Sequence, residues 1–188
     1  AHGVPIFCAS LALEIDGDLV DSWAYLFTKL KEEKGEEAAC EELEKLAKEK
    51  KNARPLVALQ AFYGGKDETR DKAVEYGNKA LAVNGDDVLA LLAQSALFGQ
   101  KGELENVVKL LQPHEAKMTR DVRLANNYFQ ALFQSRQIDK VTKLLNALAG
   151  SQNQQVKEFA LQQSKQVAQF LQQQQQQIAK LAGQPKPS

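Results

Sequence analysis

The sequence has few of the residues on which metal centres and disulfide-linked folds depend. Among 188 residues there are 2 cysteines and 2 histidines. Cys8 and Cys40 are far apart and form no CxxC pair, so we expect buried free thiols instead of a disulfide or a metal site. His2 and His114 have no neighbouring set of ligands, which argues against a bound metal.

The chain also has no excess of positive or negative charge and no long apolar run. Lysine plus arginine and aspartate plus glutamate each number 24, so no net charge attracts the chain to nucleic acid or to an anionic membrane. No apolar run approaches the roughly 20 residues of a membrane-spanning helix. The start of the chain lacks both the basic region of a signal peptide and an initiator methionine. Cytoplasmic location is therefore the default expectation, for a chain that can be a fragment or a processed product.

Catalytic motifs are also lacking: there is no GxSxG, P-loop or HExxH sequence. The stretch AFYGGKDET, residues 61–69, places two glycines before a lysine, but it follows a predicted helix and lacks the spacing of a phosphate-binding loop. We interpret it as a turn between helices. We expect no enzymatic activity, no cofactor and no metal.

What the chain does have is a composition that favours helices. Alanine, leucine, lysine, glutamate and glutamine dominate, and there are only 5 prolines. The length suits one domain with a sizeable core. The composition therefore predicts an all-α fold.

Apolar residues recur in pairs of helical segments, each pair about 33–34 residues long, a length typical of helical-hairpin repeats. The predicted units span residues 19–52, 53–85, 86–118 and 119–151. The first helices are expected to turn inward Trp23, Leu26, Phe27, Leu30, Leu56, Leu59, Phe62, Tyr63, Val88, Leu91, Leu92, Phe98, Val122, Leu124, Tyr128 and Leu132.

One helical segment, residues 72–85, has small residues along the face that it buries. Ala73, Gly77 and Ala80 lie three and four positions apart and therefore share this face. Small side chains allow a neighbouring helix backbone to approach closely. A larger residue is expected to cost about 1–3 kcal/mol through overpacking.

These segments resemble tetratricopeptide repeats. The matching residues are Trp23, Leu26 and Ala39 in the first unit and Ala73, Ala80, Leu81 and Gly85 in the second. The third and fourth units depart from the family pattern, with Val107 and Val141 where alanine is usual. The resemblance implies an α-α superhelix of about four hairpins with N- and C-terminal capping helices.

In this family the first helices line a concave surface that binds extended peptides or partner helices. The resemblance therefore implies partner-binding residues on these helices: Asn126, Asn127, Gln130, Gln134, Leu89 and Leu92. The alternative for the polar residues is that they are merely solvated. The family's carboxylate-clamp subset has polar and basic residues where this chain has Ala24, Thr28 and Ala93. This departure argues against a clamp and favours a partner of mixed or apolar character.

The two ends do not follow the repeat. Residues 1–18 are expected to form a helical cap, and residues 183–188 a disordered tail. Residues 152–182 are expected to form a glutamine-rich helix with Ser151 as its N-cap. This helix either caps the repeats or extends beyond them and pairs with another chain through Ile178 and Leu181.

The sequence thus predicts a non-enzymatic scaffold or adaptor that holds a segment of another protein in the groove of its first helices, as a subunit of a larger assembly. The alternative is a structural subunit of a stable homo- or hetero-oligomer, assembled through the C-terminal helix. Nucleic acid and a membrane span are not expected.

Overall fold

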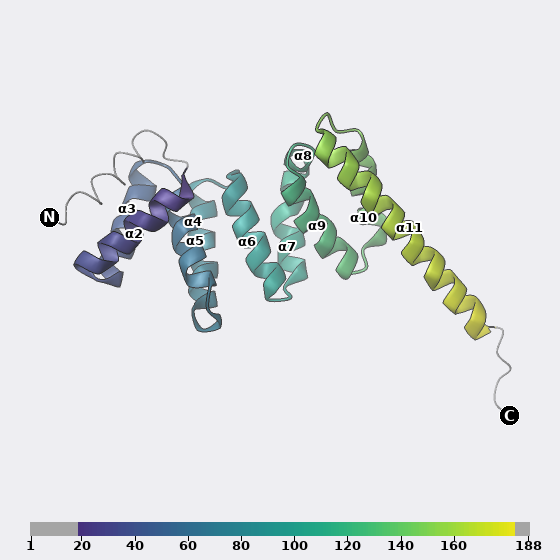
Figure 1. The fold of residues 1–188 in the computed structure, drawn as a ribbon, viewed down its shortest axis with the longest axis horizontal. Helices are drawn as coiled ribbons and strands as arrows, with labels where there is room; N and C mark the ends of the chain where they lie inside the picture. The colour runs from purple at the N-terminus through teal and green to yellow at the C-terminus, as the bar shows by residue number, and fades with distance from the viewer. Residues whose placement is uncertain (1–18, 183–188) are drawn as a thin grey trace, which may run out of the picture. The chain divides into compact units, whose positions relative to one another are not determined.

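The computed structural model describes residues 19–182, with side chains as far as Ile178, and this part of the chain is helical and contains no strand (Figure 1). The predicted all-α class is confirmed. The predicted cap at residues 1–18, the predicted tail at residues 183–188 and the side chain of Leu181 lie outside the described residues.

The helices follow one another through short turns. In chain order they are α2 (Val20–Lys34), α3 (Glu36–Glu49), α4 (Arg54–Gly64), η1 (Asp67–Thr69), α5 (Arg70–Val83), α6 (Val88–Gln100), α7 (Leu104–Leu111), η2 (Gln112–His114), α8 (Glu115–Met118), α9 (Val122–Gln134), α10 (Ile138–Ala149) and α11 (Gln154–Ala182), where η1 and η2 are short 3₁₀ turns. The glycines of the stretch AFYGGKDET end α4, which confirms that this stretch is an inter-helix turn.

The helix starts keep a strict period. The N-cap residues of the first helices are Leu19, Ala53, Asp87 and Asp121, and the interval from each to the next is constant. The second helices begin at Glu36, Arg70, Leu104 and Ile138, with the same constant interval. The third and fourth hairpins therefore start one and two residues later than the sequence pattern indicated.

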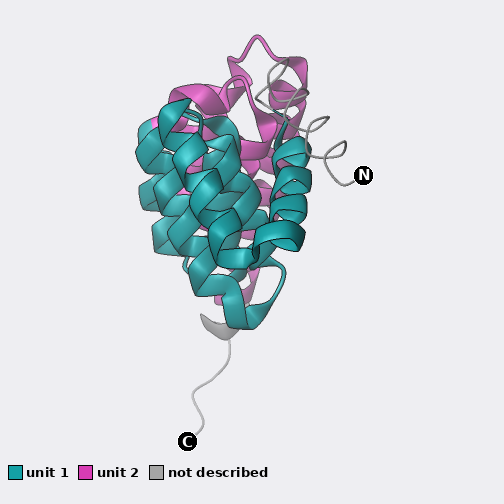
Figure 2. Cartoon of the chain, turned by 90° about the vertical axis from the view of Figure 1, so that its left-hand side faces the viewer, with its two compact units in different colours: residues 1–113 teal, residues 114–188 magenta. Residues whose placement is uncertain are grey.

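The chain divides into two compact units, residues 1–113 and residues 114–188, where the sequence favoured one domain (Figure 2). The division follows Pro113, just beyond the end of α7. Proline donates no backbone hydrogen bond and its ring clashes with the preceding helical turn. The second helix of the third hairpin accordingly ends at Leu111 and gives way to η2 and the short α8.

In the first unit three hairpins stack in sequence. The hairpins are α2 with α3, α4 with α5, and α6 with α7. Successive first helices touch, α2 against α4 and α4 against α6. Each second helix also touches the next first helix, α3 against α4 and α5 against α6. The apolar face of one hairpin is therefore covered by the hairpin that follows it.

Most residues predicted to face the core do so. Those buried in the first unit include Trp23, Leu26, Phe27, Leu30, Leu56, Leu59, Tyr63 and Leu91, while Val88, Leu92 and Phe98 are half-buried. The prediction for Phe62 was wrong, because this side chain is 44% exposed. Tyr63 follows Leu56 by seven positions and Leu59 by four and so shares their buried face, whereas Phe62 lies beside that face. Tyr63 takes the interior and Phe62 lies edge-on against Phe27.

In the second unit α9 and α10 form a hairpin, and α11 packs against both. Val156, Ala160 and Val167 of α11 are buried, and Phe159 and Phe170 contact Phe129 and Phe133. Beyond Phe170 the described side chains of α11 are exposed, except that of Gln174, which is half-buried.

Ser151 does not cap α11 as predicted. Its hydroxyl donates to the Thr119 carbonyl at 2.5 Å and accepts from the backbone N–H of Asn153. The Asn153 side chain is the group that accepts from the first turn of α11, through the backbone N–H of Gln155 at 2.9 Å. Ser151 thus links the segment before α11 to the Thr119 carbonyl, which precedes α9.

Asp87 joins two hairpins through its carboxylate. One oxygen accepts from the backbone N–H of Ala90 at 2.8 Å and caps α6, and the other lies 3.3 Å from the Arg54 guanidinium at the start of α4. We expect Asp87→Ala to lower the free energy of unfolding by about 1–2 kcal/mol. Asp87→Asn should cost less, because the amide oxygen still caps the helix. Urea denaturation measures both values, and equal losses would show that the cap contributes nothing.

Candidate functional site in the first unit

A shallow groove of about 320 Å³ lies between the first helices α4 and α6. Its lining residues are Gln60, Ala61, Gly64, Gly65, Ala93, Ala96, Leu97 and Gln100. Five of these are glycine or alanine and none is charged. The groove can therefore admit a polypeptide backbone closely, but it offers no counter-charge to an ionic ligand.

Two glutamines meet where α4, α5 and α6 come together. Gln60 of α4 donates its Nε2–H to Oε1 of Gln94 on α6 at 2.6 Å. Gln94 in turn donates to the side-chain oxygen of Asn78 at 2.9 Å and to the carbonyl of Val74 at 3.3 Å, both on α5. The side chains of Gln60 and Gln94 are 3% and 0% exposed, so these hydrogen bonds are buried and shielded from water. In the interior such bonds are strong, and an unmade one is costly.

Gly77 of α5 provides the space for this amide pair. A Cβ placed on Gly77 would overlap Gln94 Oε1 and come within 2.5 Å of Gln60 Nε2. The small residue therefore accommodates two side chains, and not a neighbouring helix backbone as the sequence suggested. The equivalent positions in the second helices of the other hairpins hold Leu43, Leu111 and Leu145.

In the Gln60 amide the nitrogen makes a hydrogen bond, and among the described residues the oxygen makes none. Its Nε2 faces Gln94, while its buried Oε1 has no hydrogen-bond partner among the described residues. Gln60 is also a lining residue of the groove. The Oε1 atom itself has almost no exposed surface, so it is an unpaired acceptor of the interior, which costs free energy, and not a contact point for a ligand in the groove.

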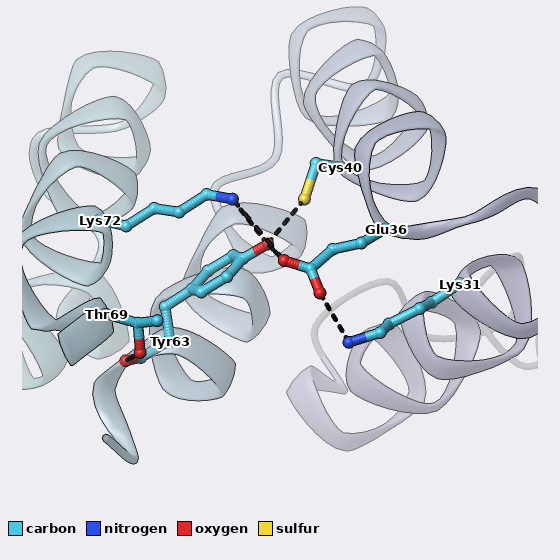
Figure 3. A network of polar contacts seen from close by, with 6 residues as sticks. All are labelled: Lys31, Glu36, Cys40, Tyr63, Thr69 and Lys72. Atoms are coloured by element: carbon cyan, nitrogen blue, oxygen red, sulfur yellow. Dashed lines mark hydrogen bonds and ion pairs between the residues drawn. The ribbon is translucent and has the colours of Figure 1, made fainter. Parts of the chain in front are cut away.

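A polar network around Tyr63 connects helices α2 to α5 (Figure 3). The Tyr63 hydroxyl donates to Glu36 at 2.6 Å, accepts from Lys72 at 2.8 Å and lies 3.2 Å from the sulfur of Cys40. Lys31 of α2 pairs with the other Glu36 oxygen at 2.6 Å. Cys40 is a buried free thiol, as predicted, and Cys8 lies outside the described residues.

The pKa shifts in this network indicate a structural role and not a catalytic one. Burial raises the pKa of the Tyr63 phenol far above its usual value, and the Cys40 and Glu36 contacts raise it further. Hydrogen bonds from Lys31 and Tyr63 lower the pKa of Glu36. The phenol thus stays protonated and the carboxylate stays charged at neutral pH. Neither group is poised to take up a proton, as a general base must be.

The residues predicted to bind a partner lie on first helices, as expected. Leu89 and Leu92 are half-buried on α6 in the first unit, one turn before the groove residues Ala93 and Ala96, and neither lines the groove. In the second unit α9 carries Asn126 and Asn127, which are half-buried, and Gln130 and Gln134, which are exposed. Their role in binding stays a prediction.

Sequence reasoning missed the groove and the amide pair beneath it. The signal was present as a repeat comparison: Gln60 and Gln94 occupy equivalent positions of consecutive hairpins, each as the single amide in an otherwise apolar stretch. The equivalent residues of the first and fourth hairpins are Leu26 and Tyr128. Glutamines thus stand in place of apolar residues in the hairpin that contains Gly77 and in the hairpin that follows it.

No protein-family model matches the chain, and no curated protein matches it. Among the described residues no group of three histidine, cysteine or acidic side chains could hold a metal ion. None of the described helices combines the length and apolarity needed to cross a membrane.

Gly77→Ala tests the amide pair directly. We expect it to lower the free energy of unfolding by about 1–3 kcal/mol through overpacking, although alanine in a helix interior is otherwise favourable by roughly 1 kcal/mol. Gly99→Ala on α6 is the matched control, because a Cβ there meets open space. It should leave stability unchanged or raise it in the same urea titration. In a Gln94→Ala background Gly77→Ala should cost less than it costs in the wild type, and an equal cost in both backgrounds would contradict the account.

The Glu36 network predicts a pH dependence. Because the folded state lowers the pKa of Glu36, its stabilising contribution is complete above the unfolded pKa of about 4.3 and is lost as the pH falls through the folded value. Glu36→Gln should therefore lose less stability than the wild type between neutral pH and pH about 3. Glu36 is partly exposed, so we expect a difference of no more than about 1 kcal/mol.

Glu37→Gln is the control for this measurement, since Glu37 is exposed on the same helix. Its unfolding free energy, followed by chemical denaturation at each pH, should run parallel to that of the wild type. If the unfolding free energy of Glu36→Gln also ran parallel to that of the wild type across this pH range, the network would not stabilise the charged form of Glu36.

Proposed function

We propose that this chain is a non-enzymatic protein-interaction module, a tetratricopeptide-like α-α superhelix of about four hairpins. It holds a segment of another protein against its first helices, as a scaffold or adaptor subunit. The observation that carries the proposal is the groove between α4 and α6, the first helices of two consecutive hairpins. In tetratricopeptide arrays the first helices form the binding surface.

The character of the groove supports a peptide ligand. Its glycines and alanines leave backbone-sized room, and its exposed polar side chain is the amide of Gln100. Amides recognise peptide N–H and C=O groups without requiring charge. The aligned clamp positions Ala24, Thr28 and Ala93 bring no charge for a carboxylate. An uncharged or apolar segment suits the groove better than an acidic tail.

The second candidate is a structural subunit assembled through α11. Its support is the exposed apolar surface beyond the packed half of that helix, where Leu171 is 36% and Ile178 is 66% exposed. Such residues gain by burial against another chain.

Filling the groove tests the first candidate. Ala96 is exposed in the groove, so Ala96→Trp should block it without disturbing the core. Ala149→Trp, exposed on α10, is the matched control. We expect affinity capture from an extract of the source cells, read by mass spectrometry, to lose its partner with Ala96→Trp and keep it with Ala149→Trp. Circular dichroism verifies that both variants fold.

A chain ending at Leu171 tests the second candidate. This end point keeps the buried residues Val156, Ala160 and Val167, which a truncation after Ser151 would remove. A partner that survives Ala96→Trp and disappears on this truncation would contradict the groove and favour the structural subunit.

A further inference from the structure

Helix α11 carries two stripes of residues with the same spacing. The first is buried or half-buried, on the side where α11 packs on α9 and α10, and consists of Val156, Ala160, Gln163, Val167, Phe170 and Gln174. The second is offset by one position, about 100° around the helix. We call it the exposed stripe, because all its members are exposed; they are Leu161, Ser164, Ala168, Leu171, Gln175 and Ile178. They alternate three and four positions apart, which is the spacing of a helix in a coiled coil.

The exposed stripe presents apolar surface that no described element covers. Leu161 is 60% exposed, Leu171 is 36% exposed and Ile178 is 66% exposed. Helix α11 has 29 residues and its neighbour α10 has 12, so the second half of α11 extends past the hairpin that supports its first half (Figure 1). Apolar surface of this kind gains free energy when another helix covers it.

The order of residues in the exposed stripe is self-complementary. In an antiparallel pair of α11 helices centred between residues 169 and 170, each apolar residue of the stripe faces an apolar residue of the other copy, and each polar residue faces a polar one. The facing pairs are Leu161 with Ile178, Ser164 with Gln175, and Ala168 with Leu171. At the centre a small side chain therefore meets a large one. An unrelated helix has no reason to present this order in reverse, whereas a second copy does so by symmetry.

The charges and the supporting hairpin agree with this pairing. Between Lys165 and Lys180 no residue is acidic or basic, so the facing segments bring no like charges together. In the antiparallel pair Lys165 lies on the same flank as Gln172 of the other copy. The antiparallel direction also sets the unsupported half of one helix against the supported half of the other. The two α9–α10 hairpins then lie at opposite ends of the contact and do not compete for the same space.

We infer that α11 pairs through the exposed stripe with α11 of a second copy of this chain, in the antiparallel direction. The inference rests on the second candidate function, assembly through α11, because it names the partner of that helix. The stripe covers roughly 26 Å of helix at about 1.5 Å per residue. One helix pair of this length buries less than the roughly 800 Å² per partner of a standard interface, so we expect a reversible dimer.

Two variants of the intact chain, changed at the same two positions, test both the partner and the direction. Position 161 faces position 178 in the antiparallel pair. Leu161→Glu with Ile178→Glu therefore brings like charges together at both ends of the contact, while Leu161→Glu with Ile178→Lys brings opposite charges together. In sedimentation velocity over about a hundredfold concentration range, the wild type should dimerise. The first variant should dimerise at least about tenfold more weakly than the wild type, and the second should dimerise more strongly than the first.

The control is matched in chemistry and place. Gln162→Glu with Gln176→Glu adds the same two negative charges to exposed positions of α11 outside the stripe, and this variant should dimerise as the wild type does. Circular dichroism verifies that every variant keeps its helices. A wild type that stays monomeric, or a Leu161→Glu, Ile178→Glu variant that dimerises as the wild type does, would overturn the inference. Equal losses in the two charged variants would overturn the antiparallel direction, because a parallel pair sets like charges together in both.

The outcomes separate this inference from the functions proposed above. A monomeric wild type whose extract partner disappears when the chain ends at Leu171 would refute the second copy and keep α11 as the binding helix for another protein. A dimer that responds to the two charged variants as expected, and whose extract partner is lost only with Ala96→Trp, would keep both the α11 pair and the groove.

Discussion

No hairpin of this chain can cover its own apolar surface. The packing of the whole chain depends on the next helix, which covers that surface. The second helix of one hairpin packs against the first helix of the next, α3 on α4 and α5 on α6. The same relation appears in the second unit, where α11 packs on both α9 and α10. Hydrophobic burial between neighbours is thus the main favourable term, and it acts locally along the chain.

Two polar features lie inside this apolar arrangement. The Tyr63 network connects the first two hairpins, and the Gln60–Gln94 pair connects the second and third. Such groups contribute modestly to stability once desolvation is counted. They do restrict which surfaces can meet, because a misplaced neighbour would leave buried amides or a buried hydroxyl unpaired. We regard them as determinants of register between hairpins.

The sequence predicted what depends on periodicity and missed what depends on three-dimensional neighbours. Leu26, Leu59 and Leu124 follow from helical spacing alone, and all are buried. The hydrogen bonds of the Tyr63 hydroxyl to Glu36 and Lys72 do not follow from spacing, because the three residues lie on different helices. The function of Gly77 was equally hidden, because the two side chains that it accommodates belong to other helices, one well before it and one well after it in the sequence. No local window contains all three residues.

The Gly77 position also limits how such an array can evolve or be re-engineered. Repeat proteins are often treated as modules that can be deleted or exchanged one repeat at a time. Removing the second hairpin here would place α3 beside α6, and Leu43 would then stand where Gly77 stands, against Gln94. A leucine has no room for that amide and offers it no hydrogen bond. Although the backbones of the first three hairpins share one period, we therefore expect them not to be interchangeable.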